Sequence, residues 1–192
     1  MTDKPMPTVL FIIVFIIVAS FAWGALLAAP WVPTLKAQRN LLIENLDLRS
    51  LDPRLRGNDG VLTIYDLGCG SGSILFAFAD RYPEARCIGY DVAILPLAIG
   101  LFRKLRSPKK YRNVSLRFGN FFTKHFNNAD LVVVFLMKKA YEKFAAKLST
   151  ELKPGTLVAI EAWPLPDRKA AQTIEGKELV PWYVYKIPNS PM

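Results

Sequence analysis

Hydrophobic and polar positions alternate in blocks from residue 61 to the C-terminus. Short apolar or β-branched runs, typical of buried strands, are separated by longer segments with the spacing of amphipathic helices. The predicted strands are Val61–Tyr65, Arg86–Tyr90, Val114–Phe118, Ala129–Phe135 and Thr156–Ala162, with two more near Lys169–Ile174 and Trp182–Ile187. The predicted helices are Ile74–Tyr82, Leu95–Leu105 and Lys138–Leu152. This alternation predicts an α/β fold, a mostly parallel sheet covered on both faces, with Trp182–Ile187 as an antiparallel edge strand.

The N-terminal segment has a different pattern. Thr8–Ala29 contains 22 residues and no charge. A helix of that length measures about 33 Å, which is enough for a bilayer core of about 30 Å. A cleaved signal peptide is the alternative, but its apolar region is shorter and ends in a small-x-small site, which Leu27-Ala28-Ala29 matches poorly. The pattern therefore predicts one uncleaved transmembrane helix.

Charges beside this run predict its orientation. Asp3 and Lys4 precede it, whereas Lys36 and Arg39 follow it with no acidic residue between the run and Glu44. Positive charge on the cytoplasmic side of a span predicts a single-pass protein of the inner (cytoplasmic) membrane whose C-terminal domain faces the cytoplasm.

The segment between the span and the first strand reads as a linker. Leu35–Leu48 has the pattern of an amphipathic helix, and Ser50–Gly60 is a polar loop rich in turn residues. This loop resembles peptides encoded by mobile palindromic repeats of bacterial genomes, which implies a bacterial source. We therefore expect an anchor over residues 1–30, a linker helix and loop over 31–60, and the α/β domain over 61–192.

Composition and charge restrict the possible partners. The net charge of the 192-residue chain is +9. Part of it lies in one cluster, Arg103, Lys104, Arg106, Lys109, Lys110 and Arg112. This cluster is either a solvated helix end or a contact for anionic lipid headgroups. Nucleic acid is not expected, because the sequence contains no recognised RNA-binding module. Two cysteines and one histidine are too few for a zinc centre, so no metal site is predicted.

A glycine-rich segment between the first strand and the first helix carries the clearest chemical signal. Tyr65–Gly72 contains the pattern D-x-G-x-G-x-G, in which glycines permit a tight turn and close approach of backbone N–H groups to a ligand. A dinucleotide fingerprint would place its third glycine at Ser73, but here it is Gly72. Asp91 ends the next strand, 19 residues after Gly72, where a carboxylate can accept hydrogen bonds from ribose hydroxyls.

The loop resembles the S-adenosylmethionine loop of class I methyltransferases. From Pro30 to Ile187 the chain is similar to a narrower group, the small archaeal protein-lysine methyltransferases and their membrane-anchored relatives, which include the ATP synthase c-subunit lysine methyltransferases. The similarity is carried by Pro30–Thr34, Asp66–Gly72, Gly119–Phe122, Ala129–Leu136 and Leu152–Thr156. One departure is that Ser71 and Ser73 stand where the group often has Asp and Arg.

The resemblance implies S-adenosylmethionine as cofactor and a role for individual residues. The backbone of Gly68, Gly70 and Gly72 would hold the methionine part of the cofactor. Asp66 would position the ammonium group, and Asp91 would accept from the ribose. Asn120 would bond the adenine edge. Phe121 would pack beside the adenine ring, or else belong to the core.

The acceptor side is less specific. The resemblance suggests Trp31, Thr34, Phe135 and Trp163 as the substrate rim, although Trp31 suits a membrane interface equally well. No dedicated base is expected, because desolvation lowers the pKa of a lysine amine from about 10.4. The chain lacks the Asp/Asn-Pro-Pro-Tyr segment of enzymes that methylate adenine or glutamine, and has Phe135–Lys138 in its place.

Together these features predict a membrane-anchored, S-adenosylmethionine-dependent methyltransferase that acts on a lysine of a membrane or membrane-associated protein. Two alternatives stay open. One is methylation of a lipid headgroup or a small lipophilic acceptor, and the other is a non-catalytic cofactor-binding membrane protein.

Overall fold

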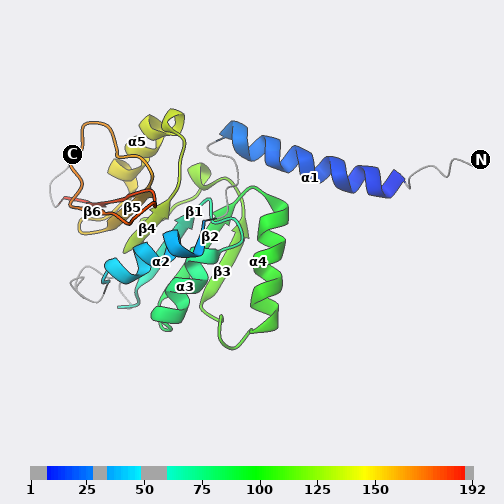
Figure 1. The fold of residues 1–192 in the computed structure, drawn as a ribbon, viewed down its shortest axis with the longest axis horizontal. Helices are drawn as coiled ribbons and strands as arrows, with labels where there is room; N and C mark the ends of the chain where they lie inside the picture. The colour runs from blue at the N-terminus through cyan, green and yellow to red at the C-terminus, as the bar shows by residue number, and fades with distance from the viewer. Residues whose placement is uncertain (1–7, 28–33, 49–59, 189–192) are drawn as a thin grey trace, which may run out of the picture.

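A seven-stranded sheet forms the centre of the protein in a computed structural model that describes residues 8–27, 34–48 and 60–188 (Figure 1). The strands are β1 (Thr63–Leu67), β2 (Arg86–Asp91), β3 (Val114–Phe118), β4 (Leu131–Val134), β5 (Leu157–Glu161), β6 (Gln172–Ile174) and β7 (Trp182–Lys186). Their order is β3-β2-β1-β4-β5-β7-β6. Strands β1 to β5 are parallel, and β7 is antiparallel to both β5 and β6. The predicted α/β fold with a mostly parallel sheet is confirmed.

The edge of the sheet differs from the prediction. The sheet ends in an antiparallel strand, as predicted, but that strand is the short β6, and the predicted edge strand β7 lies between β5 and β6. The reason is burial: Trp182 is fully buried, and its indole N–H donates to the Gln38 carbonyl over 3.1 Å. Strand β6 has only three residues, and Gln172 and Thr173 are exposed, as suits a short edge strand.

The helices lie close to their predicted positions. They are α2 (Lys36–Asn45), α3 (Ser73–Arg81), α4 (Ile94–Arg106) and α5 (Tyr141–Glu151), with short 3₁₀ segments η2 (Phe121–Thr123) and η3 (Lys138–Ala140). The helix expected over Lys138–Leu152 is therefore divided into η3 and α5.

Side-chain alternation along the strands builds two hydrophobic cores, one on each face of the sheet. On one face, Ile64 of β1 packs with residues of α2, α3 and α4. On the other, Tyr65 and Leu67 pack with residues of η2 and α5. Leu42 of α2 is completely buried in the first core, so the predicted linker helix is packed against the sheet domain.

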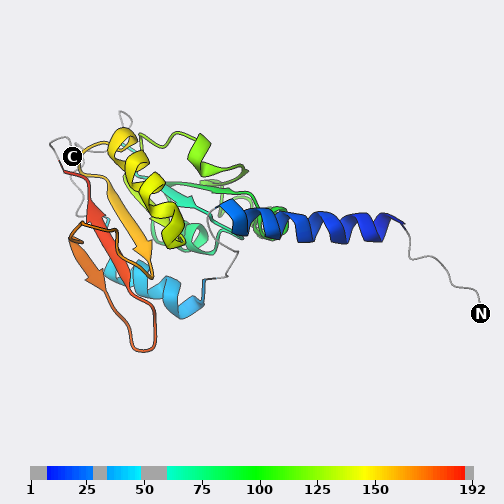
Figure 2. The same ribbon diagram turned by 90° about the horizontal axis from the view of Figure 1, so that it is seen from above.

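Helix α1 (Thr8–Leu27) forms within the predicted span and extends away from the sheet, with its C-terminal end nearest the domain (Figures 1 and 2). Across the described residues, no helix meets the length and apolarity needed to cross a membrane. The predicted Ser50–Gly60 loop lies almost wholly outside the described residues.

Candidate active site

The candidate site lies where the chain reverses its direction of travel across the sheet. From β1 the chain moves outward through β2 to β3, then returns to place β4 on the other side of β1. Parallel α/β sheets bind ligands at such a switch point, outside the carboxyl ends of the strands. Leu67, Asp91, Val134 and Glu161 end β1, β2, β4 and β5 at this edge.

The glycine loop takes a conformation that only glycine adopts easily. Gly68, Gly70 and Gly72 all have positive φ, at 89°, 52° and 74°. The N–H groups of Gly68 and Cys69 donate to the Tyr90 carbonyl over 2.9 and 3.1 Å, which holds the loop against β2. Helix α3 begins directly after Gly72. The predicted turn between strand and helix is therefore present, with its backbone held beside the helix N-terminus.

Asp91 connects β2 to this loop. Its Oδ2 accepts the Gly70 N–H over 2.6 Å, and its Oδ1 accepts the Ala93 N–H over 2.7 Å. Burial raises the pKa of this carboxyl, and the backbone N–H groups oppose the shift. Each carboxylate oxygen has a second lone pair, so the side chain can shape the loop and still accept hydrogen bonds from a ribose diol.

Three carboxyl groups converge behind the loop. Asp66 is buried, and burial together with the charges of Asp91 and Glu161 raises its pKa to about 8. Burial raises the pKa of Glu161 to about 7. A cation among these groups would relieve their mutual repulsion. The ammonium and sulfonium groups of S-adenosylmethionine are such cations, so the residues fit this cofactor.

No group of His, Cys, Asp or Glu within the described part of the chain is arranged to hold a metal ion.

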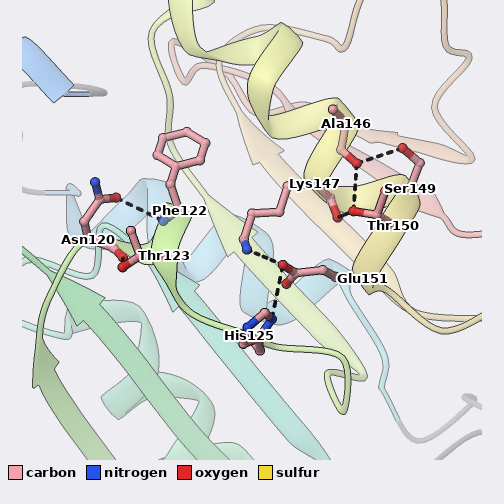
Figure 3. A network of polar contacts seen from close by, with 9 residues as sticks. All are labelled: Asn120, Phe122, Thr123, His125, Ala146, Lys147, Ser149, Thr150 and Glu151. Atoms are coloured by element: carbon pink, nitrogen blue, oxygen red, sulfur yellow. Dashed lines mark hydrogen bonds and ion pairs between the residues drawn. The ribbon is translucent and has the colours of Figure 1, made fainter.

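Asn120 and Phe121 follow β3 at the same edge. The Gly119 N–H donates to the Asp91 carbonyl over 2.8 Å, which brings this segment beside the glycine loop. Figure 3 shows the Asn120 amide oxygen turned to the Phe122 N–H, at 3.0 Å, and the amide nitrogen turned away, where it can donate to a ligand. Phe121 is buried in the second core and contacts Phe122 and Phe144. Its predicted place beside adenine stays a prediction, and only Phe122 of the pair is half-exposed.

A pocket of about 200 Å³ adjoins the acidic cluster. Its lining comes from the start of α2 and the two residues before it, from the residue after β4, from the last residue of β5, and from the segment before β7: Thr34, Leu35, Gln38, Phe135, Glu161, Glu178, Leu179 and Val180. Trp163 packs on Phe135 with 5.9 Å between ring centroids. Three of the four predicted rim residues, Thr34, Phe135 and Trp163, are thus brought together, and Trp31 lies outside the described residues.

Glu161 is the site residue that the sequence analysis missed. It ends β5 and is 8% exposed. An acidic residue inside the apolar run Thr156–Ala162, at a strand end that a parallel sheet places beside the glycine loop, was an available signal.

Comparison with known proteins agrees with this geometry. Residues 66–172 match the family described as the ANTKMT methyltransferase domain. Over 95 residues the chain is 33% identical to a protein-lysine N-methyltransferase of Saccharolobus islandicus, covering 50% of this chain and 58% of that protein. It is 28% identical over 118 residues to an uncharacterised protein of Rickettsia prowazekii, covering 58% and 46%. The chain thus spans about half the length of the curated relatives it matches.

Solved structures share the fold. The crystal structure of an RNA methyltransferase from Salinibacter ruber in complex with S-adenosyl-L-homocysteine superposes with a TM-score of 0.67 at 23% identity, covering 83% of this chain and 95% of that one. An rRNA methyltransferase from Streptomyces viridochromogenes has a TM-score of 0.54 at 16% identity, covering 88% and 92%. At these identities the likeness establishes the fold alone.

Proposed function

We propose that this chain, which belongs to the ANTKMT methyltransferase domain family, transfers methyl groups from S-adenosylmethionine to a lysine side chain of a protein. Family membership confirms the prediction of a class I, S-adenosylmethionine-dependent methyltransferase. The observation that carries the proposal is the apolar pocket beside the acidic cluster, at the carboxyl ends of β4 and β5.

The two parts of the site would have separate tasks. S-adenosylmethionine supplies a methyl group activated by a sulfonium sulfur. The Gly68–Gly72 backbone and Asp91 would hold the cofactor, and Asp66 would lie closest to its cationic part. The pocket would hold the acceptor. In-line methyl transfer requires mainly alignment of the two reactants and exclusion of water, which a pocket walled by Phe135, Leu179 and Val180 can provide.

A lysine acceptor is favoured by the shape and chemistry of the pocket. Its apolar walls suit the four-carbon stem of lysine, and the carboxyl groups of Glu161 and Glu178 suit the amine at its end. The archaeal relative, named as a protein-lysine N-methyltransferase, supports the same class of acceptor.

We further propose that the enzyme is attached to the cytoplasmic face of the inner membrane and acts on a membrane or membrane-associated protein. The uncharged run Thr8–Ala29 supports this. So does α4, which exposes a row of apolar side chains that includes Ile99, Phe102 and Leu105. Such a face, beside basic residues, suits the boundary of an anionic membrane.

The basic cluster contributes less to this attachment than its size suggests. Lys110 pairs with Asp80, Arg112 lies 3.7 Å from Glu84, and Lys104 donates to the Val114 carbonyl. Arg103 stacks on Phe76. The apolar face of α4 is therefore the stronger support for contact with lipid.

The test is transfer of a labelled methyl group from S-adenosylmethionine into membranes of a strain that lacks this protein. We expect a labelled protein band whose label is recovered as methyl-lysine after hydrolysis. Label confined to the lipid extract would favour a lipid acceptor instead. Cofactor binding with no labelled product in any fraction would favour a non-catalytic binding protein. Release of the full-length protein from membranes by alkaline carbonate would contradict the membrane span.

A further inference from the structure

Folding does not explain the position of Glu161, and of the three converging carboxyl groups it is the one that lines the pocket. Its side chain lines the pocket together with Phe135, Leu179 and Val180, and it is 8% exposed. Neither carboxylate oxygen takes part in a hydrogen bond or ion pair with another residue that the structure describes. A carboxyl group that is largely removed from water and has no partner in the fold is unfavourable unless a ligand uses it.

Its position relative to the cofactor loop is the second observation. The Glu161 charge acts on Asp66, which immediately precedes Leu67 and the glycine loop. In the sheet register, Ile160 of β5 is level with Val134 of β4 and, through it, with Leu67 of β1, so Glu161 lies at the same edge of the sheet as the glycine loop. An acceptor amine entering from the pocket would meet this carboxylate close to the transferable methyl group.

We infer that Glu161 is the catalytic residue of the acceptor site, which binds the ammonium group of the incoming lysine and takes its proton. This inference rests on the proposed function and goes beyond it by naming the group that prepares the acceptor. It differs from the expectation that the site has no dedicated base.

The proton transfer can be written with its charges balanced. The lysine ammonium gives one proton to the Glu161 carboxylate, leaving a neutral amine and a neutral carboxylic acid. The amine lone pair then forms a bond to the methyl carbon while the carbon–sulfur bond breaks, and its electron pair stays on sulfur as a thioether. The product is an N-methylammonium ion, and the total charge of +1 is unchanged. An apolar pocket favours the neutral pair over the ion pair, which assists the first step.

The other carboxyl groups nearby are less suited to this task. Asp91 already accepts two backbone N–H groups. Asp66 lies within β1, behind the loop. Glu178 lines the pocket but is exposed to water. Of these four, only Glu161 is both buried and in the pocket.

The backbone around Glu161 is held in place on both sides. Glu161 pairs with Trp182 across the sheet, and the Ala162 N–H donates to the Pro181 carbonyl over 2.9 Å. The Tyr141 hydroxyl donates to the Trp163 carbonyl over 2.7 Å. None of these bonds involves the Glu161 side chain. We therefore expect Glu161→Gln to fold.

The test compares Glu161→Gln with Glu175→Gln, a matched loss of one carboxylate at an exposed position outside the pocket lining. The full-length proteins are assayed with labelled S-adenosylmethionine and membranes from the deletion strain, and cofactor affinity is measured by calorimetry. We expect Glu161→Gln to bind the cofactor within about threefold of the wild-type affinity and to lose at least about 100-fold in kcat, the size of a general-base contribution. Glu175→Gln should keep both values.

The pH dependence separates a chemical role from a structural one. In the wild type, kcat/KM should rise with pH through an inflection near 7, because burial raises the pKa of Glu161 to about 7 and the ionised form is the base. The neighbouring Asp66 and Glu178 are present in all variants, so the loss of this inflection in Glu161→Gln would identify its source. Glu161→Asp, which keeps the carboxyl, should recover at least tenfold of the lost rate.

Activity of Glu161→Gln within threefold of wild type would overturn the inference and leave the proposed function intact. Equal loss in Glu161→Gln and Glu161→Asp, with the inflection unchanged, would also overturn it. If the wild type binds the cofactor but labels nothing, the proposed function fails first, and this inference fails with it.

Discussion

Replacing Asp66 by asparagine should make the ligand-free protein more stable at neutral pH, although it removes a residue of the site. The Asp66 carboxyl is buried, and its pKa is raised to about 8 from 3.8 by burial and by the charges of Asp91 and Glu161. Between these two values the folded chain keeps the Asp66 proton while the unfolded chain has lost it. The Asp66 contribution to stability is thus fully present below about pH 4 and falls as pH rises to about 8.

The size of this stability effect follows from the pH range between the two pKa values of Asp66. Each pH unit inside it lowers the free energy of unfolding by about 1.4 kcal/mol, so the change from pH 5 to pH 7 is about 2.7 kcal/mol. For a chain of this size 1 kcal/mol shifts the Tm by about 2–4 °C. The Tm of Asp66→Asn minus that of wild type should therefore grow by about 5–11 °C between pH 5 and pH 7.

Thermal unfolding followed by circular dichroism measures this difference. The matched control is Asp130→Asn, because Asp130 is buried equally deeply but accepts from Lys153 and from the Thr63 N–H over 2.8 and 2.7 Å. That substitution should lower the Tm, since it removes the ion pair that balances the buried Asp130 carboxylate. A Tm difference for Asp66→Asn that does not change with pH, or a loss of stability like that of Asp130→Asn, would refute the reasoning.

Two further changes test the cofactor loop. Asp91→Ala should weaken S-adenosylmethionine binding at least 100-fold in calorimetry, because it removes both the ribose acceptor and the bond that holds the Gly70 N–H; unchanged affinity would contradict the role of Asp91. Gly100→Ala should lower the Tm, even though alanine favours helices by about 1 kcal/mol, because its Cβ would lie 2.6 Å from the Ser71 carbonyl oxygen. Ala98→Gly in the same helix measures the effect of helix propensity alone. A rise in Tm for Gly100→Ala would show that α4 does not pack tightly against the glycine loop.

Much of the fold could be predicted because its signals are local. The five parallel strands are short apolar runs, and each lies within about two residues of its predicted place. The first strand begins and ends two residues later than predicted, at Thr63 and Leu67, because Asp66 is buried inside the strand although it is polar. The order of β6 and β7 in the sheet could not be predicted from the sequence. It depends on how Trp182 packs against α2 rather than on any pattern within either strand.

The site was predictable where backbone conformation demands a residue type. Gly68, Gly70 and Gly72 have positive φ, and this requirement is visible in the sequence as a spaced motif. Glu161 has no such conformational requirement. Its sequence signal, an acid inside an apolar run, does not reveal the pocket that α2 and the segment before β7 build around it. Phe121 is a second residue whose role could not be predicted from the sequence. A sequence pattern cannot distinguish an aromatic ring that faces a ligand from one that faces the core.

The contrast between the two ends of β1 strengthens the assignment of the site. Asp130, beside the start of β1, and Asp66, near its end, are 4% and 5% exposed. Asp130 has Lys153 and a backbone N–H as partners, as a carboxyl buried for structural reasons requires. Asp66 has two further carboxyl groups as neighbours and no cation among the described residues. Since folding gains nothing from this arrangement, the cation that balances it is expected to come from outside the chain, as S-adenosylmethionine and a lysine acceptor would supply.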